Sequence, residues 1–313
     1  MDDRMKFDWK NRGALKALES RIRTILPEEY QDCYDDLQPV SMGSAGLKFG
    51  SDGKVAWNEI WETFCDLAMA GGPPHKGMLL EPGCPAEIEA QSDGYQQIVE
   101  EICRGVLMVS GLAAHPSHIP GWVRVDCLSD ETAGWLLRAI VMENVSAHSE
   151  GTDVYLPAGP GYRIEKEIKN VITVIAKTCH YWFGHMRQAQ QRAISKLFAK
   201  LALESPLVQP ALSGHDFDAG KHQMFCGKMA DTIHQLTGLR LSNHPYKGWL
   251  GVEYPDVRSA VWMMRAMVAS NVLSRREGTV LFVPVSPISD PHGETVIRSL
   301  VRIHGFAATR NLI

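Results

Sequence analysis

Two stretches of this chain carry the same alternation of apolar and polar positions. Each begins with a short apolar segment after Gly-Trp, at Gly121 and at Gly248, continues as an apolar helical segment with one arginine, and ends in a second apolar segment that stops at Pro157 or Pro284. Subtracting 121 from 248 and 157 from 284 gives 127 in both cases, so the match holds without a gap. Self-similarity at a fixed spacing predicts an internally duplicated architecture.

The spacing of apolar positions predicts the elements of each copy. Strands are expected at 122–127 and 152–157 in the first copy, and at 249–254 and 279–285 in the second. Apolar helices are expected between them, over 131–147 and 256–274. Lead-in helices are predicted over 95–112 and 217–237, and further helices over 164–183, 187–204 and 293–308.

A strand, a helix and a second strand in this order are typical of a βαβ unit with parallel strands. We therefore expect an α/β fold in which internally duplicated βαβ units share a pseudo-twofold sheet core flanked by helices. Residues 1–94 form an N-terminal α+β extension with a hairpin and a helix, which also resembles a diverged third repeat. Repeat one covers 95–205 and repeat two 206–313, and together they are expected to form one compact core.

Composition narrows the class of protein. A formal net charge of −4 argues against binding to a phosphate backbone, since nucleic-acid binders usually carry a basic surface. The N-terminus lacks the apolar core of a signal peptide, and no apolar run reaches the length of a membrane span. Seven cysteines with no Cys-x-x-Cys pair are typical of reduced thiols. We expect a cytoplasmic protein with neither a nucleic-acid nor a membrane partner.

Arg138 and Arg265 are the only charged residues inside the two apolar helix cores, and they occupy matching positions. A buried guanidinium needs partners, and its planar fork suits a carboxylate or a phosphate. One interpretation is a structural ion pair with Asp126 or Glu253. The other is a pair of anion-binding side chains near the pseudo-twofold axis.

The loops after the second strand of each copy differ. Gly159, Gly161 and Arg163 precede a predicted helix in the first copy, where free backbone amides can bind an anion. Asp290 and His292 occupy the matching loop of the second copy and suit acid-base chemistry. We predict that both loops line one cavity. The alternative is turn chemistry alone, because Gly, Pro, Ser and Asp dominate turns.

Two groups of residues are candidate metal ligands, so a divalent metal is a candidate cofactor. Cys179 and His180 are adjacent soft ligands, although Cys179 also continues an apolar helix face and so reads as a buried thiol. The second group, at helical spacings of three and four, consists of His215, Asp218 and His222. The aspartates near it equally mark a helix start.

Two functions remain open. The first is the binding of a small polar or anionic ligand between the duplicated halves, with metal-assisted or acid-base catalysis by His292, Asp290 or His180. The alternative is a non-catalytic regulatory or structural module that forms a homodimer through its apolar helices. Known catalytic motifs such as a phosphate-binding P-loop or a nucleophile elbow are absent from the sequence. Bound metal would favour the enzyme.

Overall fold

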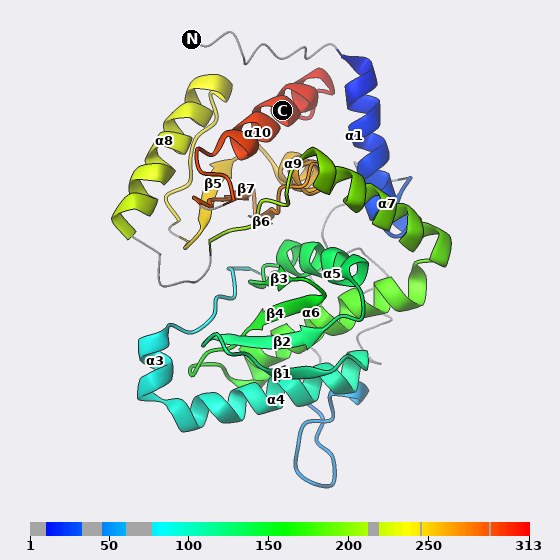
Figure 1. Cartoon of the computed structure of the whole chain (residues 1–313), viewed down its shortest axis with the longest axis vertical. Coiled ribbons are helices and arrows are strands. Elements are labelled where there is room, and N and C mark those ends of the chain that lie inside the picture. The colour runs from blue at the N-terminus through cyan, green and yellow to red at the C-terminus, as the bar shows by residue number, and fades with distance from the viewer. Residues whose placement is uncertain (1–10, 33–45, 61–76, 212–218, 245, 288) are drawn as a thin grey trace. The chain divides into compact units, whose positions relative to one another are not determined.

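A computed structural model describes residues 11–32, 46–60, 77–211, 219–244, 246–287 and 289–313. The chain forms two compact units (Figure 1). We call residues 39–192 the central unit, and residues 1–38 with 193–313 the terminal unit. These boundaries differ from the expected ones at 94/95 and 205/206, since the N-terminal helix α1 (Arg12–Ile25) packs against helix α9 (Val257–Val268) of the terminal unit.

The central unit combines helices with one small sheet. Its elements are α3 (Pro85–Ala90), α4 (Ser92–Ser110), β1 (Ala114–Pro116), β2 (Trp122–Asp126), α5 (Asp130–Met142), β3 (His148–Glu150), β4 (Asp153–Pro157), the π-helical segment η3 (Ile164–Ile168), α6 (Lys169–Cys179) and the π-helical segment η4 (His180–His185). Helix α7 (Gln188–Glu204) follows and contains the boundary between the units.

The strands of the central unit lie in the order β1-β2-β4-β3, and every neighbouring pair is antiparallel. The expected parallel pairing of β2 and β4 is therefore wrong. Strand β3, which the sequence pattern did not reveal, leads into a tight turn at Gly151, where a φ of +56° lets the chain reverse into β4. Strands β2 and β3 consequently run in the same direction with β4 between them, a split βαβ arrangement.

The terminal unit has its own sheet, in the order β5-β7-β6, again antiparallel throughout. The expectation of one shared sheet is therefore wrong, because each unit pairs its own strands through its own hairpin. The further elements of this unit are η2 (Glu28–Tyr30), α8 (Ala219–Thr237), β5 (Trp249–Glu253), β6 (Arg275–Glu277), β7 (Val280–Pro284) and α10 (Glu294–Thr309).

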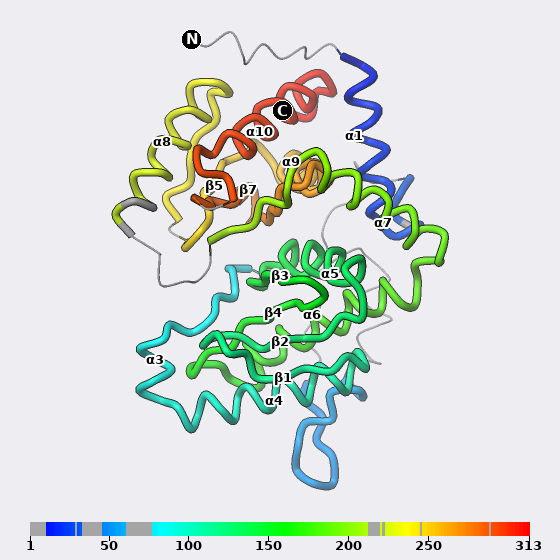
Figure 2. The backbone as a smooth tube through the Cα atoms, viewed as in Figure 1, coloured from blue at the N-terminus to red at the C-terminus, as the bar shows by residue number. Residues whose placement is uncertain are grey.

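Local features of the two units recur at the same offset as the sequence match. Trp122 pairs with Pro157 in one sheet, and Trp249 pairs with Pro284 in the other. Each apolar helix is followed by an asparagine with positive φ, Asn144 at 58° and Asn271 at 63°. Their side-chain amides donate to the carbonyls of Gly77 (2.7 Å) and Ser205 (2.8 Å). A residue in the left-handed conformation thus follows the apolar helix in both units, whose backbones Figure 2 traces.

Helices α5 and α9 form the core of their units, as their apolar sequences predict. Helix α5 packs against β3, β4 and α6, and α9 packs against β6, β7, α10 and α1. Trp135 and Trp262 are 6% and 1% exposed. Ser129 and Asp256 cap the two helices by accepting from backbone amides in the first turn. Burial of these apolar faces is the main force that holds each unit together.

The N-terminal part agrees with the sequence pattern where it is described. Gly50 and Lys54 close the expected turn, with a hydrogen bond of 2.8 Å beside an antiparallel bridge between Phe49 and Val55. Most of the helix of the predicted third copy falls on residues 61–76, which lie outside the described residues. None of the described helices is long and apolar enough to cross a membrane.

Candidate functional sites

The loop of Gly159, Gly161 and Arg163 already holds an anion of the chain itself. The Oε2 atom of Glu167 accepts from the backbone amide of Arg163 at 3.0 Å and from its Nε at 3.4 Å. Burial raises the pKa of Glu167, but these hydrogen bonds outweigh it and lower the pKa to about 2. Two of the predicted anion donors, the backbone amide and Nε of Arg163, therefore serve Glu167, while the role of the Gly159 and Gly161 amides stays a prediction.

The matching loop of the terminal unit caps a helix. Asp290 is buried, and its two carboxylate oxygens accept from the backbone amides of Thr295 (3.2 Å) and Val296 (3.0 Å) at the start of α10. His292 is exposed, and among the described residues no hydrogen bond joins it to Asp290. This loop and the Arg163 loop belong to different units. Asp290 acts here as a capping residue.

The two helix arginines are buried, as expected for their position. Arg138 and Arg265 are each 5% exposed. Arg138 donates from Nη1 to the carbonyl of Gly134 at 2.7 Å, and burial lowers its pKa to about 10. Asp126, the carboxylate considered as its ion-pair partner, lies instead 3.5 Å from both Arg124 and His115.

The structure describes only some of the predicted metal ligands. His215 and Asp218 lie outside the described residues, as does the side chain of His222. Cys179 is buried at the end of α6, and burial raises the pKa of its thiol well above the usual range, which disfavours the thiolate that metals bind. Among the described residues, no group of three or more His, Cys, Asp or Glu is arranged to hold a metal ion.

His180 has a partner that the prediction did not assign to it. Its Nε2 lies 2.7 Å from Nε2 of His185, and the two rings meet edge to face at a centroid distance of 4.6 Å. Burial, and then the neighbouring His185, lower the pKa of His180. The sequence signal was present, because Cys179, His180 and His185 form its densest cluster of nitrogen and sulfur ligands.

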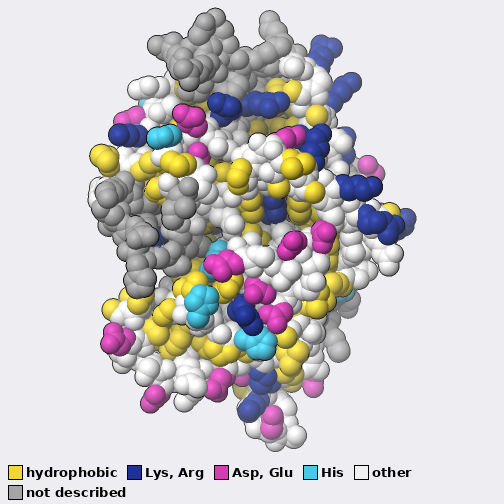
Figure 3. All heavy atoms as spheres, in the orientation of Figure 1, with side chains coloured by type: hydrophobic (Ala, Val, Ile, Leu, Met, Phe, Trp, Pro, Cys, Tyr) yellow, Lys and Arg dark blue, Asp and Glu magenta, His cyan; other side chains and the backbone are white. Residues whose placement is uncertain are grey.

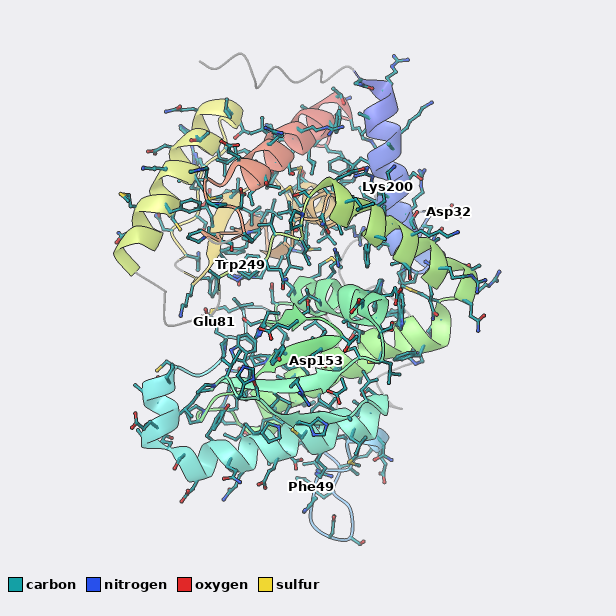
Figure 4. All side chains as sticks on the ribbon, viewed as in Figure 1. Asp32, Phe49, Glu81, Asp153, Lys200 and Trp249 are labelled. Carbon is teal, nitrogen blue, oxygen red and sulfur yellow. The ribbon has the colours of Figure 1, made fainter. Side chains whose placement is uncertain are left out.

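One face of the central sheet carries a polar network that the sequence analysis missed. A row across all four strands consists of His115, Arg124, Tyr155 and His148. Beside it, a row of carboxylates consists of Asp126, Asp153 and Glu150. Figure 3 shows acidic, basic and histidine side chains gathered over this sheet, and Figure 4 labels Asp153 there. The available signal was the alternation Trp-Val-Arg-Val-Asp in β2, which puts the arginine and the aspartate on one face.

Distances within this network show weak pairing of several charges. The Nε atom of Arg124 lies 3.5 Å from Asp126 and 3.8 Å from Asp153, and Nε2 of His115 lies 3.5 Å from Asp126. Asp126 and Asp153 are direct cross-strand partners, a like-charge pairing that destabilises a sheet. In the terminal unit, the positions of Arg124 and Asp153 are Gly251 and Val280. The Arg124–Asp153 contact thus has no counterpart in the terminal unit, although Glu253, Arg275 and Glu277 occupy the positions of Asp126, His148 and Glu150 there.

A cavity of about 400 Å³ lies in the terminal unit. It is lined by α1, by the C-terminal ends of α7 and α9 and by one face of α10, which lie close together in Figure 1. Its polar and charged lining residues are Arg21, Glu204, Ser205, Ser270, Glu294, Thr295, Arg298, Ser299 and Arg302. Sequence periodicity did not reveal this cavity, because its walls come from distant parts of the chain: α1 ends at Ile25, while α7 begins only at Gln188 and α10 at Glu294.

The positive charges of this cavity are only partly neutralised. Arg21 forms an ion pair with Glu204 at 3.3 Å. Arg298 and Arg302 are exposed and one turn apart on α10, and neither has a carboxylate within 4.0 Å among the described residues. The Arg302 guanidinium lies 5.5 Å from the centre of the Phe306 ring. Two like charges at this spacing repel each other, so an anion bound between them would relieve the repulsion.

Comparison of the chain with models of known families, with characterised proteins and with solved structures finds no match.

Proposed function

We propose that the protein binds a small anionic molecule in the cavity between α1 and α10, with Arg298 and Arg302 as its principal anion ligands. The observation that carries this proposal is the pair of guanidiniums without a carboxylate partner, among the described residues, on the wall of a 400 Å³ cavity. Cavities that hold small molecules begin at about 300 Å³, so the volume suits a compact ligand. The planar fork of arginine pairs with phosphate or carboxylate through two parallel hydrogen bonds.

The other groups of the cavity suit a polar ligand of this kind. The hydroxyl groups of Ser205, Ser270 and Ser299 lie among the lining residues and can donate to ligand oxygens. The hydroxyl group of Thr295, in the first turn of α10, can also donate to a ligand oxygen. Glu204 and Glu294 bring negative charge, so the site favours a ligand that carries both anionic and hydrogen-bonding groups over a bare polyanion.

Comparison of the two units supports a specialised role for the two arginines. At the offset between the two copies, Arg298 and Arg302 correspond to Val171 and Ile175, which are buried in α6. The matching face of the central unit is therefore packed and apolar. In the terminal unit the same helix positions carry two exposed arginines that border the cavity.

The experiment is a titration of the purified full chain with inorganic pyrophosphate and, separately, with citrate. A ligand that binds only the folded state raises Tm, by an amount that grows with ligand concentration. The double variant Arg298→Gln with Arg302→Gln should lose the Tm rise with both probes. The matched control Arg240→Gln removes an exposed arginine of the same unit that is not among the cavity-lining residues, and should keep the rise. An equal response of both variants would refute the proposal.

A second candidate is acid-base catalysis on the polar face of the central sheet. The observation that favours it is the His115–Asp126 contact of 3.5 Å beside Arg124, since a carboxylate can set the tautomer of a histidine base and an arginine can hold an anionic substrate. Hydrolysis of a panel of phosphate and carboxylate esters would test it. His115→Gln should abolish any turnover that His118→Gln leaves intact, and turnover in both variants would refute this candidate.

We also infer that the two units arose by internal duplication. The support is the constant offset between the bounds of the paired strands and between the lead-in helices α4 and α8. The alternative function, a homodimer through the apolar helices, has less support, because α5 and α9 are already buried in the single chain. The absence of a nucleic-acid partner remains a prediction from the net charge. An experimental structure in which residues 92–158 and 219–285 failed to superpose would refute the duplication.

A further inference from the structure

The π-helical segment η4 brings two histidines together that an α-helix would keep apart. His180 and His185 are five residues apart, and at 3.6 residues per turn they would point about 140° away from each other. A π turn instead closes hydrogen bonds from residue i to i+5 and aligns such a pair. The result is a distance of 2.7 Å between the two Nε2 atoms. π turns inside helices are frequently found at functional sites.

The backbone that carries these histidines is held in place on several sides. The side-chain amide of Gln191 donates to the carbonyls of Trp182 (2.6 Å) and Met186 (3.3 Å). The indole of Trp182 donates to Thr132 of α5 at 3.0 Å and stacks on Trp135 at a centroid distance of 5.5 Å. A histidine pair on such a support keeps its geometry without a ligand, which lowers the entropic cost of binding one.

Both imidazoles are partly exposed, and the neighbouring Phe183 and Gly184 are exposed as well. An ion can therefore reach the two Nε2 atoms from solvent. Metal binding at these ring nitrogens would break no backbone hydrogen bond of the helix, because they are side-chain atoms. Within this pair, one Nε2–H donates to the other Nε2 at 2.7 Å, so a ligand that replaces that proton can bind both rings at once.

We propose that His180 and His185 together bind a divalent transition-metal ion that prefers square-planar or tetragonal coordination, with Cu²⁺ as the preferred ion. If a metal ion lay at the usual 2.0–2.1 Å from both nitrogens, the N–metal–N angle would be about 80°. This angle is near the right angle of a square-planar or tetragonal site and far from a tetrahedral one, which disfavours Zn²⁺. The order of divalent affinities for nitrogen ligands also peaks at Cu²⁺.

Of the described residues, His180 and His185 supply two ligands to this ion, and water can fill further coordination positions. Among the described residues, no third His, Cys, Asp or Glu joins the pair in a metal-binding group, and Cys179 is buried. On binding, the proton between the two Nε2 atoms leaves its nitrogen, and that imidazole takes the tautomer protonated at Nδ1. The site is thus an exchangeable one with open coordination positions. It lies in the central unit and is independent of the anion-binding cavity.

The test is a titration of the full chain with Cu²⁺, followed by calorimetry and electron paramagnetic resonance, with Zn²⁺ as a comparison. We expect one tight Cu²⁺ per chain, with a tetragonal spectrum split by two imidazole nitrogens, and weaker binding of Zn²⁺. His180→Gln and His185→Gln should each weaken Cu²⁺ binding by at least about tenfold, or 1.4 kcal/mol. The matched control His118→Gln, an exposed histidine of the same unit, should bind as the wild type does.

Three outcomes would overturn the proposal. These are an unchanged affinity in the double variant of His180 and His185, a loss of equal size in His118→Gln, and tighter binding of Zn²⁺ than of Cu²⁺. Circular dichroism of each variant checks that the loss does not come from unfolding. Both histidines are partly exposed, so their replacement by glutamine should leave the fold intact.

Discussion

Lys177 donates to Glu143 at 2.7 Å in an ion pair whose side chains are only 4% and 6% exposed. The pair joins α6 to the end of α5 inside the central unit. In the terminal unit the matching positions are His304 and Ser270, so the second unit has no such pair. Two charges buried this deeply contribute little net stability as a pair, but either one alone is costly.

Removal of one partner should therefore destabilise the protein strongly. We expect Lys177→Met to lower the free energy of unfolding by about 3–5 kcal/mol, because the Glu143 carboxylate stays buried without its cation. The double variant Lys177→Met with Glu143→Leu should recover a large part of this loss. Urea denaturation of the three proteins measures both effects. A double variant less stable than Lys177→Met would contradict this account.

The apolar helices should depend on their tryptophans. Trp135→Ala and Trp262→Ala should each cost about 3–5 kcal/mol, since the loss of the buried ring adds a cavity to the transfer term. Phe183→Ala is the control, because the Phe183 ring is 48% exposed and its removal should change stability by less than about 0.5 kcal/mol. Melting of either tryptophan variant at the wild-type temperature would show that the helix is not part of the core.

Alanine substitutions at two glycines of the terminal unit should distinguish the cost of a strained backbone from the cost of a steric clash. Gly248 has a φ of +76°, and an added Cβ would lie 2.9 Å from the carbonyl oxygen of Ala211. Gly278 has a φ of +54° with open space around it. Gly278→Ala should cost about 1–2 kcal/mol from the left-handed backbone alone. Gly248→Ala should cost more, and equal unfolding free energies for the two variants would contradict the close approach.

His148 should make the protein sensitive to moderate acid. Burial lowers its pKa from 6.5 to about 4, and its ring stacks on Tyr155 and meets Trp122 edge to face. Between these two pKa values the unfolded chain binds more protons at His148 than the folded chain does. The contribution of neutral His148 to the free energy of unfolding is therefore complete above pH 6.5 and is lost as pH falls towards 4. His148→Phe removes the titration and keeps an aromatic ring.

The measurement is the free energy of unfolding of both proteins between pH 7.5 and pH 4.5. Relative to His148→Phe, the wild type should lose stability over this range. Groups that titrate in both proteins, such as the carboxylates, cancel in the comparison. Parallel pH profiles would mean that His148 is not held neutral by burial.

Local sequence determined most of the secondary structure of this chain. The apolar spacing predicted α4 and α10 close to their observed bounds, because apolar residues recur at helical spacing along a helix that packs on one face. Helices α5 and α9 were also predicted, but they end at Met142 and Val268, five and six residues before the expected ends at 147 and 274. The strands β2, β4, β5 and β7 were also predicted, because each is a short apolar segment in the sequence. The constant offset between the two matching stretches was also visible in the sequence, and the burial of Trp135 and Trp262 was predicted from it.

Strand direction was decided by tertiary structure. The apolar pattern of β2 and β4 is equally compatible with parallel and antiparallel pairing. The hairpin between β3 and β4 makes the pairing antiparallel. Strand β3 has only three residues, too few to show the alternation by which a strand is predicted. The sequence pattern predicted no strand between the helix at 131–147 and the strand at 152–157, although β3 ends at Glu150 and Gly151 closes its hairpin with β4.

The candidate sites were also decided by tertiary structure. Arg298 and Arg302 stand one turn apart in the sequence, but the cavity wall opposite them comes from α1, at the other end of the chain. His180 and His185 meet only because the helix widens into a π turn, which residue spacing in an α-helix does not predict. Asp290, a candidate catalytic carboxylate in the sequence, accepts hydrogen bonds at the start of α10, and which amides it binds depends on the fold around it.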